Sequence, residues 1–266
     1  MKTTVNIKSL FLTVMCTVLL SACATTTHNN DKQFTELAQQ LWQAQQQLNE
    51  TSPGELTDMS PQALEQRHQQ RLGWQARLQQ INVKALSEQN QINHAILSYR
   101  LADQIDEYRF GAHLMPLTSE SGFHTSLGFM VQRGSFKTAA DYQYYVQKLS
   151  AIPRYLQQQT DWMKLGLAKG VTQPKAVLKG FEQSIISYVV QDPTQSVFYQ
   201  PFNRKPAFIS ETEWQQLTAQ AAEQITQAVN PAYQAFYDFM VNEYLPGARE
   251  TIAASALPEG AAFYQN

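Results

Sequence analysis

Hydrophobic residues recur at helical spacing along most of the chain from residue 34 onward. Positions three, four or seven residues apart lie on one side of an α-helix, which makes this spacing the main sequence signal for an amphipathic helix. The first such segment places on one face Phe34, Leu37, Leu41 and Leu48, with Trp42 beside them. Ser52-Pro53-Gly54 follows and predicts the end of this helix.

Two further helices are predicted before residue 111. Ser60 followed by Pro61 is typical of a helix N-cap and first helical residue, and the apolar pattern then continues to about Ile81. Ser87 begins a third helix, and Gly111 is a plausible residue for its C-terminal stop. The residues that the third helix is expected to turn inward are Ile92, Ala95, Ile96, Tyr99, Ala102 and Ile105.

The segment from Gly111 to Phe136 has four glycines, a proline and no helical period, so we expect a long ordered loop with short extended pieces. Thr138 with Asp141 three residues later is a capping signal for the next helix. Pro153 allows a new start, and the helix that follows ends at Gly170.

The last hundred residues continue the helical pattern with one interruption. Pro174 opens a strongly apolar helix that Asp192-Pro193 stops, and residues 194–206 are irregular. Ser210 and Glu213 form a capping box before a helix to about Val229, where Asn230-Pro231 restarts or kinks the chain. An aromatic face, interpreted as core, comprises Tyr233, Phe236, Tyr237, Met240 and Tyr244.

No segment alternates with period two, and no repeat of fixed length is visible. The predicted class is therefore all-α, a multi-helix array with long ordered loops and little or no sheet. Residues 33–266 are expected to form this helical domain.

The N-terminal residues are typical of an export signal. Lys2 and Lys8 precede an apolar run that is too short to span a bilayer. Leu20-Ser21-Ala22-Cys23 has the form of a bacterial lipobox, so residues 1–22 are predicted to be a lipoprotein signal peptide and Cys23 the lipidated first residue of the mature chain. Residues 23–32 would be a polar tether. Because Ala24 rather than aspartate follows the cysteine, we expect an outer-membrane anchor facing the periplasm of a Gram-negative cell.

Composition narrows the chemistry. The formal net charge of −2 provides no excess of basic residues to neutralise phosphates, so a nucleic-acid partner is not expected. The two cysteines are both accounted for, because Cys16 leaves with the signal and Cys23 carries lipid. No thiol remains for catalysis, a metal or a disulfide.

The chain contains no complete catalytic motif. No two of its five histidines have the spacing of a His-Glu-x-x-His zinc helix, and neither a Gly-x-Ser-x-Gly elbow nor a phosphate loop occurs. No catalytic or metal-binding residue is therefore assigned. His113, Glu120 and His124 share the predicted loop and are the candidates for lining a cleft. Asp103 and Asp106 lie near Arg100 and Arg109, which indicates surface ion pairing along a helix.

Several stretches taken together resemble the bacterial domain of unknown function 885 family. Each is short, and their order and spacing over residues 34–266 carry the resemblance. They are Ile105–Gly111, Leu114–Leu117, Gly122–His124, Trp162–Pro174, Phe198–Phe202, Pro231–Tyr233, Glu243–Glu250, Ala256–Gly260 and Phe263-Tyr264.

The resemblance implies a largely helical, exported, zinc metallopeptidase-like protein. Members carry a His-Glu-x-x-Pro-Gly-His-His type motif well downstream, in which two histidines bind zinc and the glutamate activates the metal-bound water. This sequence has no such motif, so no zinc ligand is carried over, and zinc is expected only in the full-length family fold.

Three hypotheses follow. The first is an N-terminal portion of a peptidase-like lipoprotein, from a truncated product or a split gene, silent alone and packing against a catalytic half. The second is a stand-alone periplasmic lipoprotein that binds a peptide or protein partner. The third is an enzyme with its own site around Asp103, Asp106, His113, Glu120 and His124.

Overall fold

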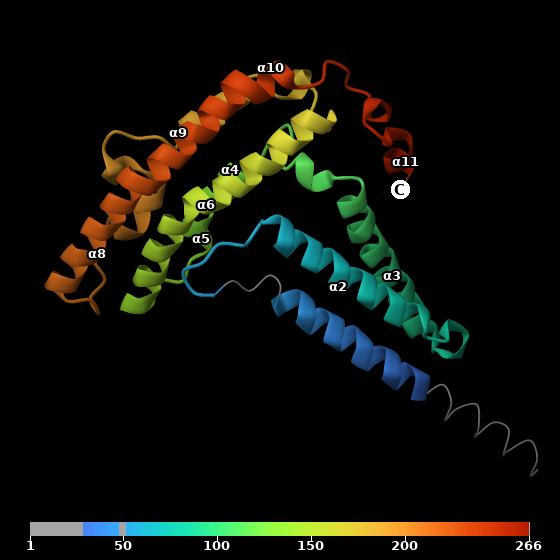
Figure 1. Ribbon diagram of the computed structural model, residues 1–266. Coiled ribbons are helices and arrows are strands. Elements are labelled where there is room, and N and C mark those ends of the chain that lie inside the picture. Colours follow the sequence, from blue (N-terminus) through green and yellow to red (C-terminus); the bar gives the residue numbers. More distant parts are fainter. Residues whose placement is uncertain (1–28, 48–51, 266) are drawn as a thin grey trace, which may run out of the picture. The chain divides into compact units, whose positions relative to one another are not determined.

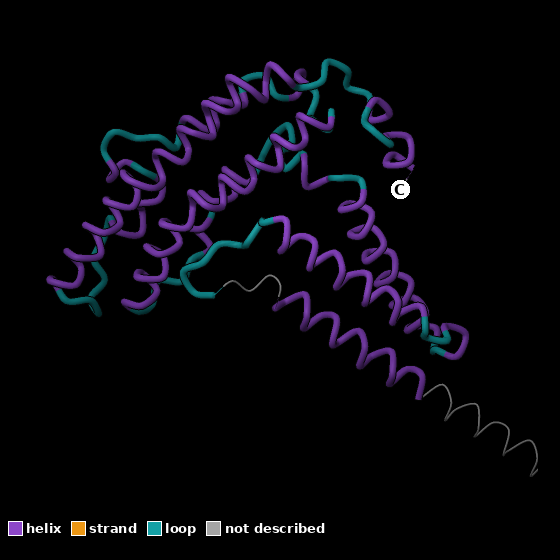
Figure 2. The backbone as a smooth tube through the Cα atoms, viewed as in Figure 1, coloured by secondary structure: helices purple, strands orange, loops and turns teal. Residues whose placement is uncertain are grey.

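The computed structural model describes residues 29–47 and 52–265, and over these ranges every regular element is a helix. The extended pairings within the described ranges are isolated bridges, Leu117 with Gly122 and Pro174 with Arg249. Figure 2 shows the result as helices joined by loops. The predicted all-α class is therefore confirmed. The predicted signal peptide and the lipidated Cys23 lie outside the described residues.

The chain divides into two compact units. Met1–Leu48 with Arg67–Ile105 forms the smaller unit, and Asn49–Gln66 with Asp106–Asn266 forms the larger. The boundaries fall inside two helices, α2 (Pro61–Gln79) and α3 (Glu88–Arg109). Each unit has a hydrophobic core of its own.

In the smaller unit, a helix over residues 29–47 packs with α2 and α3, and η1 (Val83–Ala85) lies between the latter two. Residues 29–32, at the end of the predicted tether, are already helical. The Asp31 carboxylate accepts the Ser87 backbone N–H at 2.9 Å, which ties this helix to the start of α3. The buried core comprises Phe34, Leu37, Leu41, Leu78, Ile81, Leu86, Leu101 and Ile105.

The prediction of which α3 residues face inward is wrong over most of the helix. Ile92, Ile96 and Tyr99 are 56%, 54% and 67% exposed, whereas Leu101 and Ile105 are buried. The helix carries apolar residues on two sides, and periodicity alone does not say which side is covered. The predicted starts and stops agree better. Ser60 Oγ accepts the Ala63 N–H at the start of α2, and Gly111 after α3 has a φ of 73°.

The larger unit is built on α6 (Ala139–Lys169), which lies beside α9 (Asn230–Phe239) in Figure 1. The Thr138 hydroxyl accepts the Asp141 N–H, and the Asp141 carboxylate accepts the Thr138 N–H, which confirms the predicted capping box. The predicted new start at Pro153 is wrong, because Pro153 lies inside α6. A proline there has no N–H, so the bond to the carbonyl four residues back is missing although the helix continues.

The C-terminal part of the larger unit is one continuous helical segment, called the rod below, rather than two helices with a restart at Asn230-Pro231. It runs through α8 (Glu211–Gln224), the π-helix η6 (Ile225–Val229), α9, the π-helix η7 (Met240–Tyr244) and α10 (Leu245–Gly247). The Asn230 side chain bonds both the N–H and the carbonyl of Val190, so Asn230 anchors the rod instead of breaking it.

The spacing of buried residues explains the π-helices. From Leu217 to Tyr233 the buried positions are every fourth residue, through Ala221, Ile225 and Val229. At 100° per residue these four steps would turn the buried line by about 160° around an α-helix. The wider turns of η6 reduce this drift, so the predicted aromatic face stays in the core, with Tyr233, Phe236, Met240 and Tyr244 almost fully buried.

Short helices occupy two segments for which the prediction differed. One was expected to be a loop, and the other to be a single long helix. Residues 111–136 contain η2 (Ala112–Leu114), α4 (Phe123–Gly128) and α5 (Met130–Arg133), so the prediction of a loop is wrong for about half of that stretch. The apolar helix expected after Pro174 is reduced to η3 (Lys175–Val177) and α7 (Phe181–Ile186), separated by Gly180 with a φ of 78°.

Residues 193–202 form η4 (Pro193–Gln195) and η5 (Val197–Phe202), and the chain closes with η8 (Ala254–Ala256) and α11 (Gly260–Gln265). Among the described helices, none combines the length and apolar character needed to cross a bilayer.

Candidate functional site

A groove of about 390 Å³ lies between α6 and the α9–η7 stretch of the larger unit. It follows both helices for about three turns, so its lining comes at intervals of three or four residues from each. The residues that line it are Pro153, Leu156, Gln157, Thr160, Lys164, Ala232, Ala235, Phe236, Asp238, Phe239, Asn242 and Glu243.

The floor of the groove is apolar and its rims are polar. Leu156, Phe236 and Phe239 belong to the buried core and close the bottom. Ala232 and Ala235 have small side chains, which leaves space beside α6. The π-helix η7 follows directly and carries Asn242 and Glu243 on the same side as Asp238. An aromatic floor between polar rims is the usual form of a binding groove.

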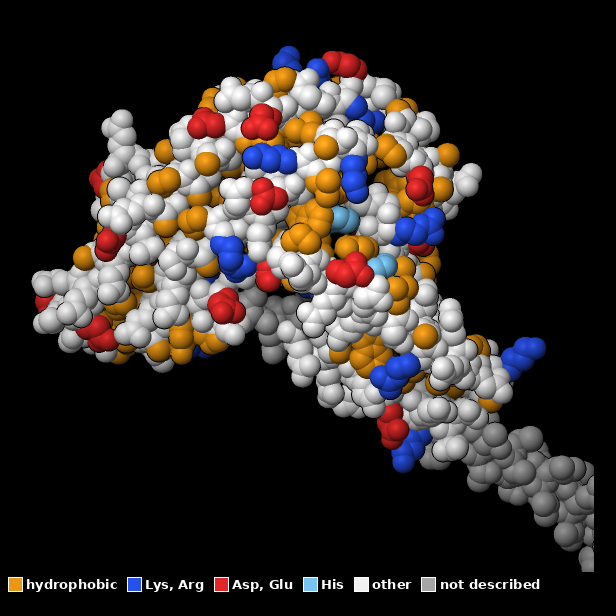
Figure 3. Space-filling view, in the orientation of Figure 1, with side chains coloured by type: hydrophobic (Ala, Val, Ile, Leu, Met, Phe, Trp, Pro, Cys, Tyr) orange, Lys and Arg blue, Asp and Glu red, His pale blue; other side chains and the backbone are white. Residues whose placement is uncertain are grey.

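Charges on the rims are of both signs. The Lys164 ammonium lies 5.5 Å from the centroid of the Phe239 ring, so the cation is held over the floor. The Asp238 carboxylate accepts the Gln234 amide N–H at 2.9 Å. Figure 3 shows basic and acidic side chains interspersed on the visible face rather than gathered in one patch. The groove thus offers donors and acceptors for a polar chain.

His113 is a packed side chain of the larger unit. Its ring stacks on Tyr108 at 4.9 Å and meets the edge of Trp162 at 4.7 Å between centroids. Burial lowers the pKa of His113, and the nearby Lys169 ammonium adds to this effect. Trp162 is itself fixed, because its indole N–H donates to the Met59 carbonyl at 2.7 Å.

His124 is fully buried and forms part of the core. Its Nε2 lies 2.9 Å from Ser184 Oγ, and because that hydroxyl donates to the Phe181 carbonyl it accepts from the histidine. The rings of Phe123, Phe181 and Phe236 surround it. Burial lowers the pKa of His124 to about 4, so the ring is neutral at pH 7.

Glu120 stands apart from both histidines in an exposed turn. Its backbone N–H approaches the Thr118 hydroxyl at 3.4 Å, in the turn closed by the bond from the Thr118 N–H to the Ser121 carbonyl. His113, Glu120 and His124 have different neighbours, and none of the three lines the groove between α6 and α9. Asp106 pairs with Arg109 at 3.3 Å along α3, the expected surface ion pair.

These residues do not fit a zinc ion. Within residues 29–47 and 52–265, no three side chains of the histidine, cysteine, aspartate or glutamate type gather closely enough to hold a metal. The Nε2 atoms of His124 and His94 are already bonded, to Ser184 and to the Leu78 carbonyl, and His113 is enclosed by rings. A zinc site needs three or four such ligands at about 2.0–2.3 Å.

The sequence predicted a cleft beside the 111–136 segment, whereas the groove lies between α6 and α9. Its polar residues lie at helical spacing. Thr160 and Lys164 are four apart on α6, and Asp238 on α9 is four residues before Asn242 on η7. That spacing is a usable signal, since each pair borders the buried stripe of its own helix. The pairing of the two helices is not visible in the sequence, because about 75 residues separate them.

Comparison with known proteins places this arrangement in a family. The family model of bacterial proteins of unknown function termed DUF885 matches residues 42–266. The chain belongs to the DUF885 family. This DUF885 chain is also similar to a crystal structure, "the putative lipoprotein from Colwellia psychrerythraea", with a TM-score of 0.68 and 16% sequence identity. No curated protein matches the sequence.

The structural match covers 92% of this DUF885 chain but 45% of the Colwellia chain. The chain therefore spans less than half the length of the solved structure that it resembles. At this identity the likeness establishes the helical fold alone.

Proposed function

We propose that the chain is the N-terminal helical portion of an exported, peptidase-like lipoprotein and that it does not hydrolyse peptides alone. The observation that carries this proposal is the pair of coverages, 92% of this chain against 45% of the solved structure. The peptidase-like chemistry proposed for the whole protein rests on the resemblance of its motifs to a metallopeptidase-like family. Over residues 29–47 and 52–265, no three histidine, cysteine, aspartate or glutamate side chains gather closely enough to hold zinc.

Export and anchoring rest on the N-terminal sequence. The lipobox ending at Cys23 follows a short apolar run, and the mature chain would be held by lipid at the outer membrane on its periplasmic side. The description of the Colwellia structure as a lipoprotein supports the same assignment. Zinc belongs to the catalytic half, which would be the partner of this chain.

A second candidate is a lipoprotein that binds a peptide or protein without chemistry. The observation in its favour is the groove between α6 and α9, with its aromatic floor and rims of both charges. A groove of this form suits a short extended peptide, whose main-chain groups bond to polar rims.

One experiment separates these functions. The lipidated chain is purified in detergent, supplied with zinc chloride, desalted, and incubated with a pool of quenched fluorescent tetrapeptides of random sequence. We expect hydrolysis at the rate of the buffer blank and far less than one zinc per chain by plasma mass spectrometry. Stoichiometric zinc together with hydrolysis would overturn the proposal. A saturable rise in the fluorescence anisotropy of the peptides without hydrolysis, lost in Asp238→Ala, would favour the second candidate.

A further inference from the structure

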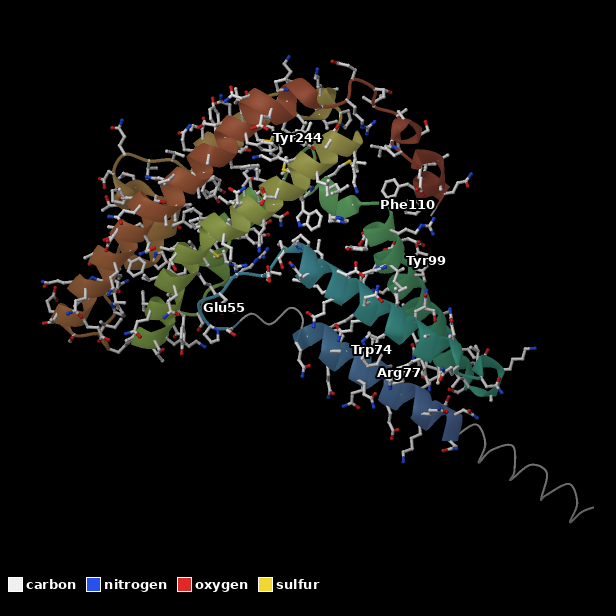
Figure 4. All side chains as sticks on the ribbon, in the orientation of Figure 1. Glu55, Trp74, Arg77, Tyr99, Phe110 and Tyr244 are labelled. Carbon is white, nitrogen blue, oxygen red and sulfur yellow. The ribbon has the colours of Figure 1, made fainter. Side chains whose placement is uncertain are left out.

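The outer row of α3 is an apolar surface without a partner in its own unit. It comprises Ile92, Ala95, Ile96 and Tyr99, at the i, i+3, i+4 and i+7 positions of one helical face. All four are exposed, with Ile92, Ile96 and Tyr99 more than half accessible to solvent. Figure 4 labels Tyr99 on this helix. Single exposed apolar residues are ordinary, but a row with this spacing is the pattern of a packed helix face.

The opposite side of α3 already contacts the core. Leu101 lies nine residues after Ile92, which at 100° per residue places it about 180° around the helix. Leu101 and Ile105 are buried against the helix over residues 29–47 and against α2. α3 is therefore apolar on two opposite sides. A helix of this kind is suited to the interior between two layers rather than to the surface.

The apolar surface extends beyond α3. Trp42, on the helix over residues 29–47, is 60% exposed. It borders a small pocket together with Leu97 and Arg100 of α3, so it lies beside the edge of the outer row. The row itself carries no charged side chain between Ile92 and Tyr99, and its polar neighbour Asn93 is neutral. Arg100 borders the same pocket as Trp42, and Asp103 continues the face of the row one turn beyond Tyr99. The surface therefore suits an apolar protein face with polar groups at its border.

We propose that the outer row of α3, with Trp42 at its edge, is the docking surface for a polypeptide that corresponds to the part of the Colwellia structure this chain does not cover. This inference rests on the proposed function, because it names where the proposed catalytic half binds. More than half of the Colwellia chain has no counterpart in the matched region. A polypeptide of that size, folding with the helical portion, supplies the second layer that a two-sided α3 requires.

The size of the surface favours this occupant over a second copy of the chain. A stable dimer between two proteins buries about 800 Å² on each partner. Even fully covered aromatic side chains bury only about 150–250 Å² each. Trp42, Ile92, Ile96 and Tyr99 are only 54–67% exposed, so the row together with Trp42 falls short. A second half of the same fold can cover the row as one part of a much larger contact.

The test places a photo-crosslinking amino acid at Ile96 or Tyr99 in the source bacterium. The matched control position is Tyr144 on α6, an exposed side chain of similar size in the larger unit. We expect an adduct at the α3 positions only, with peptides from a polypeptide that corresponds to the part of the Colwellia structure this chain does not cover. A self-adduct, an unrelated protein or no adduct would overturn the inference.

A measurement on the purified chain keeps the inference testable without the partner. Ile96→Glu should leave the melting temperature within about 2 °C, since the side chain is exposed, and should reduce fluorescence of a dye that binds apolar surface. Lower stability with unchanged dye fluorescence would show that the row is already covered, and would overturn the inference. Neither outcome depends on peptide hydrolysis, so a failure here is distinguishable from a failure of the proposed function.

Discussion

Two buried tyrosine hydroxyls of the larger unit donate hydrogen bonds to main-chain carbonyls. The Tyr145 hydroxyl donates to the Phe198 carbonyl at 2.9 Å, and the Tyr233 hydroxyl donates to the His124 carbonyl at 2.7 Å. Burial raises the pKa of Tyr233 well above its usual value, so the hydroxyl stays protonated and remains a donor. Such bonds add little net stability, but losing one leaves a buried carbonyl unpaired, at about 1–3 kcal/mol.

His124 should make the stability of the chain depend on pH. The unfolded chain binds a proton near pH 6.5, whereas the folded chain does so only near pH 4, so stability falls as pH drops through this window. The gap corresponds to about 3 kcal/mol. Urea unfolding from pH 7 to pH 4 should show the native chain losing about that much more than His124→Leu. Parallel curves for the two proteins would contradict the assignment.

At the residue scale, local chemistry was predictable and burial was not. The capping pairs Ser60 with Ala63 and Thr138 with Asp141 lie within three residues, and the structure has both. The enclosure of His113 depends on Trp162, 49 residues later, and that of His124 on Phe236. Nothing in the spacing of the histidines indicates those contacts.

Among the elements, α6 depends on a close approach of backbones. A Cβ on Gly166 would lie 2.6 Å from the Val171 carbonyl oxygen and 2.8 Å from that of Leu114, at η2. These atoms belong to the main chain and have little freedom to move. Gly166 therefore allows η2 and the segment after α6 to pack directly on the helix.

Two glycine substitutions should have opposite effects. Gly166→Ala is expected to destabilise the chain by about 1–3 kcal/mol, because the added methyl overpacks the contact. Gly73→Ala, within α2 and with no atom within 4 Å, is expected to stabilise it by about 0.5–1 kcal/mol. Denaturant melts of both variants check this. A gain from Gly166→Ala would refute the described backbone contact.

The spacing of hydrophobic residues predicted where most helices lie, and each error in that prediction has a physical cause. α3 has two apolar sides, so the pattern could not say which one is buried. Pro153 stays in its helix because the surrounding core holds α6 on both sides of it. The helix predicted after Pro174 was too long. Apolar residues of that segment contact the core from irregular backbone as well as from α7, so an apolar pattern there does not require a helix.

At the scale of the whole molecule, some properties were predictable from the sequence and others were not. The sequence alone carried enough ordered motifs to indicate the family and the helical class. It could not reveal the groove or the division into two units, because both depend on contacts between distant segments.

The predicted membrane attachment concerns the entire molecule, and its test uses both cysteines. Cys23→Ser should move the chain from the membrane fraction to the soluble periplasmic fraction and abolish labelling with a palmitate analogue. Cys16→Ser, in the predicted signal peptide, is the matched control and should change neither. Fractionation with immunoblotting measures the outcome. Continued labelling of Cys23→Ser would refute the lipobox assignment.

The π-helices η6 and η7 also affect how this chain is aligned with others. A π turn holds one more residue than an α turn over the same contact, so it absorbs an inserted residue without a loop. A homologous rod that is α-helical throughout would align with this one only through single-residue gaps near 225–229 and 240–244. Such gaps would mark a change from π-helix to α-helix. An alignment that placed a surface loop at either gap would shift every aromatic residue between the two gaps out of register.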